Sequence, residues 1–144
     1  MRVGDLIESR KEVYTVSEES SVHQVAQYLR AKEVRTVGVL GADGRLTGVI
    51  SQSDISDKVA AENKCPAWMK ASDIMTRELV TVTAERTLDE CLLLMEQNGI
   101  FHLIVLNEVG EFRGMLSVKD ILRVVASDEK ARADLFEAFI FPPR

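Results

Sequence analysis

GVISQSD at residues 48–54 and GMLSVKD at residues 114–120 are two copies of one pattern, in which apolar residues lead into Ser-x-x-Asp. The copies belong to a longer repeat: residues 13–60 align with residues 79–126 without a gap, at a constant offset of 66. Twelve of the 48 aligned pairs are identical, and many others exchange one apolar residue for another. A repeat of this length indicates a supersecondary unit that is used twice.

Each repeat predicts the element order β-α-β-β-α. A short strand precedes a helix with a Ser or Thr cap, then come two strands joined by a glycine-containing hairpin, and a second helix closes the unit. In the first repeat the predicted elements are strands 14–16, 36–40 and 46–51, a helix with its cap near Ser20–Ser21, and a helix over 53–62. In the second repeat they are strands 80–82, 102–106 and 112–117, a helix from Thr87 to a left-handed cap at Gly99, and a helix over 119–127.

One repeat of about 48 residues is too short to bury a sufficient core alone. We therefore expect an α+β fold in which two such units pack about a pseudo-twofold axis. The predicted organisation is a first unit over residues 1–64, a second unit over 65–127 that includes the linker 63–72, and a helical tail over 128–144. The tail carries an apolar stripe that either covers the module or joins a dimer, and its members are Ala131, Leu135, Phe136, Phe139 and Ile140.

The composition excludes several classes of protein. Apolar residues make up 46% and charged residues 28% of 144 residues, which is typical of a globular chain. The net charge of −5 disfavours nucleic acid as a partner. No apolar stretch approaches the ~20 residues of a membrane span, and the N-terminus lacks the apolar core of a secretory signal. We expect a cytoplasmic protein without a membrane partner. Two histidines and two cysteines without metal-ligand spacing indicate no metal site.

The duplicated Ser-x-x-Asp has two interpretations. In a capping box the Ser accepts a hydrogen bond from the helix backbone, and the acidic side chain accepts one from the cap amide. Alternatively, the end of a strand that leads into a helix presents free amides to a phosphate, and a carboxylate there can accept hydrogen bonds from vicinal hydroxyls. The second combination suits a ribose phosphate. No nucleophile or third polar group accompanies Asp54 and Asp120, so paired acid–base catalysis is not expected.

The paired units, the two heptapeptides and the segment Asp73-Ile74-Met75-Thr76 resemble tandem cystathionine-β-synthase (CBS) domains, the Bateman module. The resemblance covers residues 3–127, and Asp5-Leu6-Ile7 is a looser counterpart of the Asp-Ile-Met-Thr segment. It implies two clefts between the units that bind AMP, ADP, ATP or a related adenosyl ligand. It implies a regulatory, non-catalytic module that senses energy state without an obligatory cofactor.

The resemblance also implies roles for individual residues. The motif Asp would hold the ribose hydroxyls and the motif Ser would face the phosphate, while the opposite unit would supply most of the adenine pocket. Arg35, His102 and Lys119 are the cations nearest to the expected phosphates. The implied ligand-binding residues of the Asp54 cleft are Asp54, Ser51, Val49, Met75, Val80, Ile100, Phe101 and His102, and those of the Asp120 cleft are Asp120, Ser117, Lys119, Met115, Tyr14, Val34, Arg35 and Thr36.

Two departures from the family pattern predict unequal clefts. Gly38 and Ile104 stand where the family often has Pro, and Ser53 stands where Lys119 supplies a cation in the second repeat. The Asp120 cleft is therefore expected to hold the charged phosphate tail. The predicted partners are an adenine nucleotide, a second copy of the chain and a separate effector protein. The alternative is a structural dimerisation module with empty or blocked clefts, in which Ser-x-x-Asp serves only as a cap.

Overall fold

The computed structural model of the chain describes residues 1–8, 12–127 and 129–140, apart from the side chains of residues 131, 135, 139 and 140. The chain forms two compact units. The first-repeat unit is Tyr14–Leu79, and the second-repeat unit combines Met1–Val13 with Val80–Arg144. Each unit is described by itself below.

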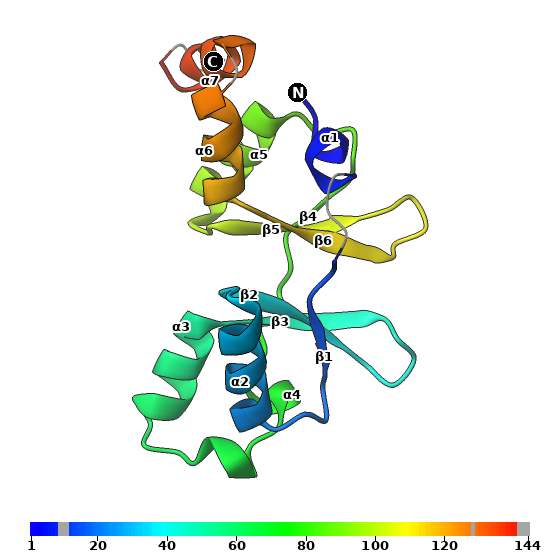
Figure 1. The fold of residues 1–144 in the computed structure, drawn as a ribbon, viewed down its shortest axis with the longest axis vertical. Helices are drawn as coiled ribbons and strands as arrows, with labels where there is room; N and C mark the ends of the chain where they lie inside the picture. The colour runs from blue at the N-terminus through cyan, green and yellow to red at the C-terminus, as the bar shows by residue number, and fades with distance from the viewer. Residues whose placement is uncertain (9–11, 128, 141–144) are drawn as a thin grey trace. The chain divides into compact units, whose positions relative to one another are not determined.

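The first-repeat unit is a three-stranded sheet in the order β1-β2-β3. Strand β1 runs parallel to β2, and β2 and β3 form an antiparallel hairpin. Figure 1 shows α2 and the segment that begins with α3 on one face of this sheet. The elements are β1 (Thr15–Ser17), α2 (Val22–Lys32), β2 (Thr36–Leu40), β3 (Leu46–Ser51), α3 (Gln52–Ile55), the π-helix η1 (Ser56–Ala60), the 3-10 helix η2 (Pro66–Trp68) and α4 (Ala71–Ile74).

The second-repeat unit has the same sheet, in the order β4-β5-β6, with the same parallel and antiparallel pairs. Helices α5 and α6 lie on one face of it (Figure 1). The elements are α1 (Val3–Ile7), β4 (Thr81–Val82), α5 (Leu88–Asn98), β5 (His102–Leu106), β6 (Phe112–Ser117), α6 (Val118–Ser127) and α7 (Glu129–Ile140). The expected α+β class and the β-α-β-β-α order of both repeats are confirmed.

The two units bury side chains at matching positions of the repeat. Each core takes one side of the first helix and the middle of the hairpin strands. These positions are apolar in both copies because each lies between a sheet and its covering helices. The buried pairs are Val22 and Leu88, Val25 and Cys91, Leu29 and Met95, Val37 and Leu103, Val39 and Val105, and Ile50 and Leu116.

The short helices ahead of the repeats change the division of the chain. Helix α1 precedes the first repeat, yet the backbone amide of Val3 donates to the carbonyl of Arg86 (2.9 Å) and its side chain is fully buried in the core of the second-repeat unit. Helix α4 belongs to the first-repeat unit, where the amide of Ala71 donates to the carbonyl of Ser20 (2.7 Å). The compact units therefore differ from the expected 1–64 and 65–127, because each short helix fills the core of the repeat that does not follow it.

The second helix of the first repeat also differs from its expected form. Its α-helical part ends at Ile55, and a π-turn follows in which the amide of Ala61 donates to the carbonyl of Ser56 (2.8 Å). In the second repeat α6 is a single α-helix over Val118–Ser127.

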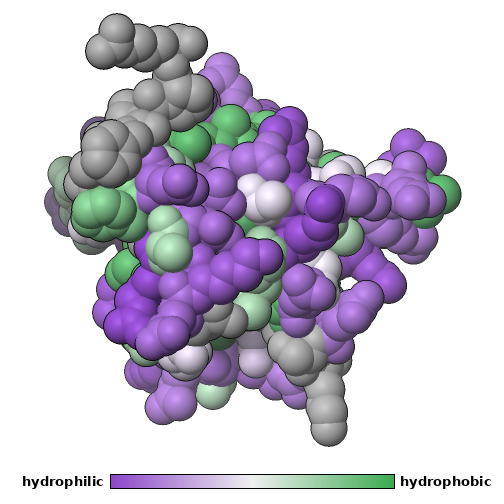
Figure 2. Space-filling model, turned by 90° about the horizontal axis from the view of Figure 1, so that it is seen from above, coloured by the Kyte–Doolittle hydropathy of each residue, from purple (hydrophilic) through white to green (hydrophobic). Residues whose placement is uncertain are grey.

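Helix α7 contacts α5 and α6 of its own unit. The tail thus covers part of the second-repeat unit. This agrees with the first of its two expected roles, covering the module, and does not test the second, joining a dimer. Figure 2 looks onto this end of the molecule and shows small hydrophobic areas interrupted by hydrophilic ones. The stripe residues Ala131, Leu135, Phe139 and Ile140 lie outside the described side chains, as do Asp128 and residues 141–144 of the predicted tail, and Phe136 is exposed.

The first helix of each repeat ends in the left-handed conformation, with different residues at the matching position. Gly99 has φ 63° at the end of α5, as predicted, whereas Glu33 has φ 56° at the end of α2. In this conformation the Cβ of a residue lies close to the backbone, which costs steric energy. Gly has no Cβ and therefore avoids this cost.

We expect Gly99→Ala to lower the free energy of unfolding by about 1 kcal/mol and Glu33→Gly to raise it by about the same amount. Urea unfolding of the two variants and the wild type measures both changes. If the free energy of unfolding changed in the same direction in both variants, the cost of a Cβ in the left-handed conformation would not explain the difference between the two caps.

Candidate functional site

Ser51 and Asp54 form a reciprocal pair where β3 leads into α3. The amide of Ser51 donates to Asp54 Oδ2 (2.9 Å), and the amide of Asp54 donates to Ser51 Oγ (3.2 Å). This is the capping box expected from the residue spacing. The pair fixes the carboxylate at the first turn of the helix.

Ser117 and Asp120 repeat this geometry where β6 leads into α6. The amide of Ser117 donates to Asp120 Oδ2 (2.8 Å), and the amide of Asp120 donates to Ser117 Oγ (3.1 Å). In each repeat the cap occupies Oδ2 of the motif carboxylate. Capping therefore occurs in both copies, and it is one of the two interpretations left open by the sequence.

The residues just before the second strand of each repeat lie next to the motif of their own unit. The carbonyl of Arg35 accepts from the amide of Gln52 (3.0 Å), and the carbonyl of Phe101 accepts from the amide of Val118 (3.1 Å). In the strand register Thr36 pairs with Ser51 and His102 with Ser117. The structure thus brings the candidate residues Val34, Arg35 and Thr36 to the Ser51 end of the first-repeat unit, and Ile100, Phe101 and His102 to the Ser117 end of the second-repeat unit.

Exposure separates these candidates. The side chains of Arg35 and Lys119 are exposed, and 74% of the surface of Phe101 is open to solvent. Val34, Thr36, Ile100 and His102 are half-buried. The surface at each junction therefore holds a cation, and in the second repeat also an aromatic ring.

The remaining candidates line the strands. Val49 lies in β3, and its amide donates to the carbonyl of Thr76 (3.0 Å) while the amide of Thr76 donates back (2.8 Å). Met75 is buried in the core of the first-repeat unit and directly precedes Thr76, which pairs with Val49 of β3. The half-buried residues Tyr14, Val80 and Met115 stand before β1, before β4 and within β6.

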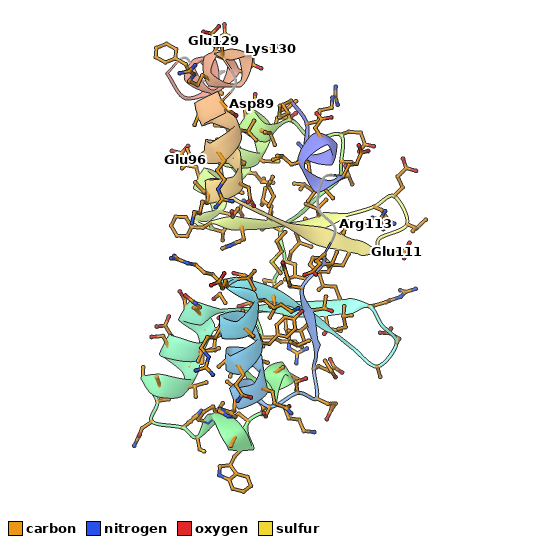
Figure 3. All side chains as sticks on the ribbon, in the orientation of Figure 1. Asp89, Glu96, Glu111, Arg113, Glu129 and Lys130 are labelled. Carbon is orange, nitrogen blue, oxygen red and sulfur yellow. The ribbon has the colours of Figure 1, made fainter. Side chains whose placement is uncertain are left out.

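The titratable side chains at the second junction are those of His102, Lys119 and Asp120. Burial lowers the pKa of His102, and the nearby charge of Asp120 opposes that change. Lys119 lies exposed in the first turn of α6. Figure 3 shows Glu111 and Arg113 at the hairpin end of the β5–β6 pair, opposite the end where α6 begins. These two charges therefore do not border the Ser117–Asp120 pair.

The described residues contain no group of His, Cys, Asp or Glu that could hold a metal ion. Burial raises the pKa of the Cys91 thiol to about 11, so the thiolate form that reacts or binds metal is disfavoured. Within the described part of the chain, no helix is both long and apolar enough to cross a membrane.

Two residues near Asp54 were missed from the sequence. Lys58 Nζ lies 3.0 Å from Asp54 Oδ1, and Thr76 Oγ1 donates to the same oxygen at 3.3 Å. The spacing of Asp54 and Lys58, four residues apart on a helix, is a signal that could have identified the ion pair. Thr76 ends the Asp-Ile-Met-Thr segment, but its contact with Asp54 depends on a turn that the sequence does not reveal.

The fold and the two capped carboxylates define a tandem-repeat module with one polar junction per repeat. The family model described as CBS domain matches residues 3–61 and 71–127. The chain belongs to the CBS domain family, and the expected resemblance is confirmed.

Solved structures with the same fold include complexes with adenosyl ligands. A CBS domain protein from Pyrobaculum aerophilum, complexed with AMP, matches with a TM-score of 0.80 and 22% identity, over 94% of this chain and 98% of that one. A CBS domain pair in complex with 5-methylthioadenosine and S-adenosyl-L-methionine matches with a TM-score of 0.78 and 24% identity, over 88% of this chain and 97% of that one. At these identities the likeness establishes the fold.

Curated relatives are longer than this chain. An uncharacterized protein of Methanopyrus kandleri is 28% identical over 85% of this chain and 61% of its own length. A homoserine O-acetyltransferase of Methanohalophilus mahii is 28% identical over 90% of this chain but only 26% of its own length. The match therefore covers about a quarter of the length of the enzyme.

Proposed function

We propose that the chain is a non-catalytic regulatory module that binds adenosyl ligands, AMP, ADP or ATP among them, at its Ser-x-x-Asp junctions. The observation that carries the proposal is the repetition of Ser and Asp at both junctions. The other Ser/Thr capping boxes, Ser21 with Gln24 and Thr87 with Glu90, differ in residue type between the repeats, although both form the reciprocal pair of hydrogen bonds. Identity at the junctions therefore goes beyond what a cap requires.

The chemistry of the second junction suits a nucleotide. The Asp120 carboxylate can accept hydrogen bonds from ribose hydroxyls. The first turn of α6, a ten-residue helix, directs backbone amides and a positive dipole end toward an anion, and Lys119 adds a charge there. In the first repeat the α-helix ends after four residues. We therefore assign the phosphate tail to the Asp120 junction, and the adenine contacts to the candidate residues given above.

The ligand would act through a shift in population. A ligand that binds one arrangement of the protein better favours that arrangement in proportion to the difference in affinity. The output would be a change in self-association as a homodimer or in the binding of a separate effector protein, within the cytoplasm. Neither output needs an obligatory cofactor.

Thermal and urea unfolding with millimolar adenosine, AMP, ADP, ATP, NAD and S-adenosylmethionine test the proposal. A ligand at about 100 times its dissociation constant should stabilise the chain by ~2.7 kcal/mol. GMP at the same concentration controls for general anion effects. The proposal would be overturned if none of the adenosyl ligands raised the free energy of unfolding above that of the ligand-free chain.

The second candidate is a structural dimerisation module. The observation in its favour is that Ser51 and Ser117 both receive the helix-capping bond, so the motif has a structural use without any ligand. If no adenosyl ligand stabilises the chain, this candidate replaces the first.

A further inference from the structure

The carboxylate of Asp54 is occupied on both oxygens by groups of its own unit. Oδ2 accepts from the amide of Ser51 (2.9 Å) and from Ser51 Oγ (3.2 Å), and Oδ1 accepts from Thr76 Oγ1 (3.3 Å) and Lys58 Nζ (3.0 Å). A carboxylate offers about four lone-pair positions. A ribose diol can therefore reach this carboxylate only if an internal donor leaves it.

Lys58 is held in place by a second bond. Its Nζ donates to the carbonyl of Ile74 at the end of α4 (2.8 Å), so one ammonium group joins Asp54 to the α4 segment. Lys58 lies in the π-turn Ser56–Ala60, and 44% of its side chain is exposed, against 13% for Asp54. The side chain of Lys58 is thus more exposed to solvent than the carboxylate with which it pairs.

Thr76 is held against Asp54 by the sheet. Its backbone pairs with Val49 through two hydrogen bonds. Gly48 allows this close approach, because a Cβ at that position would lie only 2.9 Å from the carbonyl oxygen of Thr76. Thr76 is therefore fixed by the backbone, whereas Lys58 reaches Asp54 through a flexible side chain and is the donor that can leave.

The second repeat has no counterpart of this lysine. Position 124, which matches Lys58, is a valine that packs against the core of the second-repeat unit. The two junctions therefore differ in the residue four positions after the motif Asp, while both contain the reciprocal Ser–Asp cap.

We propose that Lys58 is an internal competitor for the ribose-binding position on Asp54, so that the Asp54 junction binds an adenosyl ligand only after Lys58 is displaced. The inference rests on the proposed function. It makes Lys58 a determinant of the affinity of the Asp54 junction for the ligand.

The test uses adenosine, which carries no charge, so that loss of a cation does not weaken the binding of a phosphate. Asp120→Ala removes the second junction, and isothermal titration then reports on Asp54 alone. We expect adenosine to bind Lys58→Met in the Asp120→Ala background about tenfold more tightly than Asp120→Ala itself, because one charged hydrogen bond no longer has to be broken. Lys64→Met, which removes an exposed lysine of the same unit, is the matched control and should leave the affinity unchanged.

The outcomes distinguish the inference from the function on which it rests. The competitor role of Lys58 is overturned if the Lys58→Met, Asp120→Ala double variant binds adenosine no more tightly than Asp120→Ala, while the wild type binds adenosine or AMP. The proposed function is unaffected by that result. Failure of both ligands to bind the wild type and every variant overturns the proposed function, and the competitor with it.

Discussion

Asp120→Ala is expected to abolish most of the stabilisation that AMP confers on the wild-type chain. The variant removes the carboxylate proposed for the ribose hydroxyls at the junction to which the phosphate tail is assigned. With AMP at about 100 times the wild-type dissociation constant, the expected loss is ~2.7 kcal/mol. Unfolding by urea with and without AMP measures it, because the difference between the two curves removes any effect of the variant on the free protein.

The same variant also loses a helix cap, and this effect needs its own control. Asp120 accepts from the amide of Ser117 just as Glu90 accepts from the amide of Thr87 at the start of α5 in the same unit. Glu90→Ala should therefore lower the free energy of unfolding by about 1 kcal/mol, as Asp120→Ala does, but keep the stabilisation by AMP. Retention of the full AMP effect in Asp120→Ala would contradict the assigned role.

Val3→Asp is expected to lower the free energy of unfolding by about 3–5 kcal/mol, the largest effect predicted for a single substitution here. The side chain of Val3 is fully buried in the core of the second-repeat unit. The substitution removes the burial of a valine and places a carboxyl group where it has no partner. Urea unfolding measures the change, and Val13→Asp, at a position that is 44% exposed, is the matched control with little expected effect.

The location of the damage tests the exchange of the short helices. Hydrogen exchange should accelerate in residues 80–127, more than 70 positions away along the chain, and much less in residues 14–79. Faster exchange centred on residues 14–79 would show instead that α1 supports the repeat that follows it.

Much of each unit was predictable because the information is local. The strands, the hairpins, the caps near Ser20–Ser21 and Thr87, and the left-handed cap at Gly99 follow from apolar periodicity and from residues with restricted backbone preferences. Repetition strengthened each of these predictions, since a pattern such as Ser-x-x-Asp was seen twice at one offset. The capping box at both junctions was likewise readable from spacing alone.

The candidate site was predictable only in its centre. Ser51, Asp54, Ser117 and Asp120 follow from the motif, whereas Lys58 and Thr76 were missed at Asp54. Whether a lysine four residues along a helix turns to the carboxylate depends on its other partner, here the carbonyl of Ile74 from a distant helix. The contact of Thr76 depends in the same way on its pairing with Val49.

The sequence by itself determined the repeat, the order of its elements, the α+β class and the carboxylate at each junction, because these depend on neighbours a few positions apart. Only the tertiary structure decided that α1 completes the core of the second-repeat unit and α4 that of the first-repeat unit. It also decided that α7 packs on α5 and α6, and that Lys58 forms an ion pair with Asp54. These features depend on which surfaces meet after the chain has folded back on itself. Apolar residues such as Val3 and Ala71 would fit either core by hydrophobicity, and only shape and backbone hydrogen bonding select one.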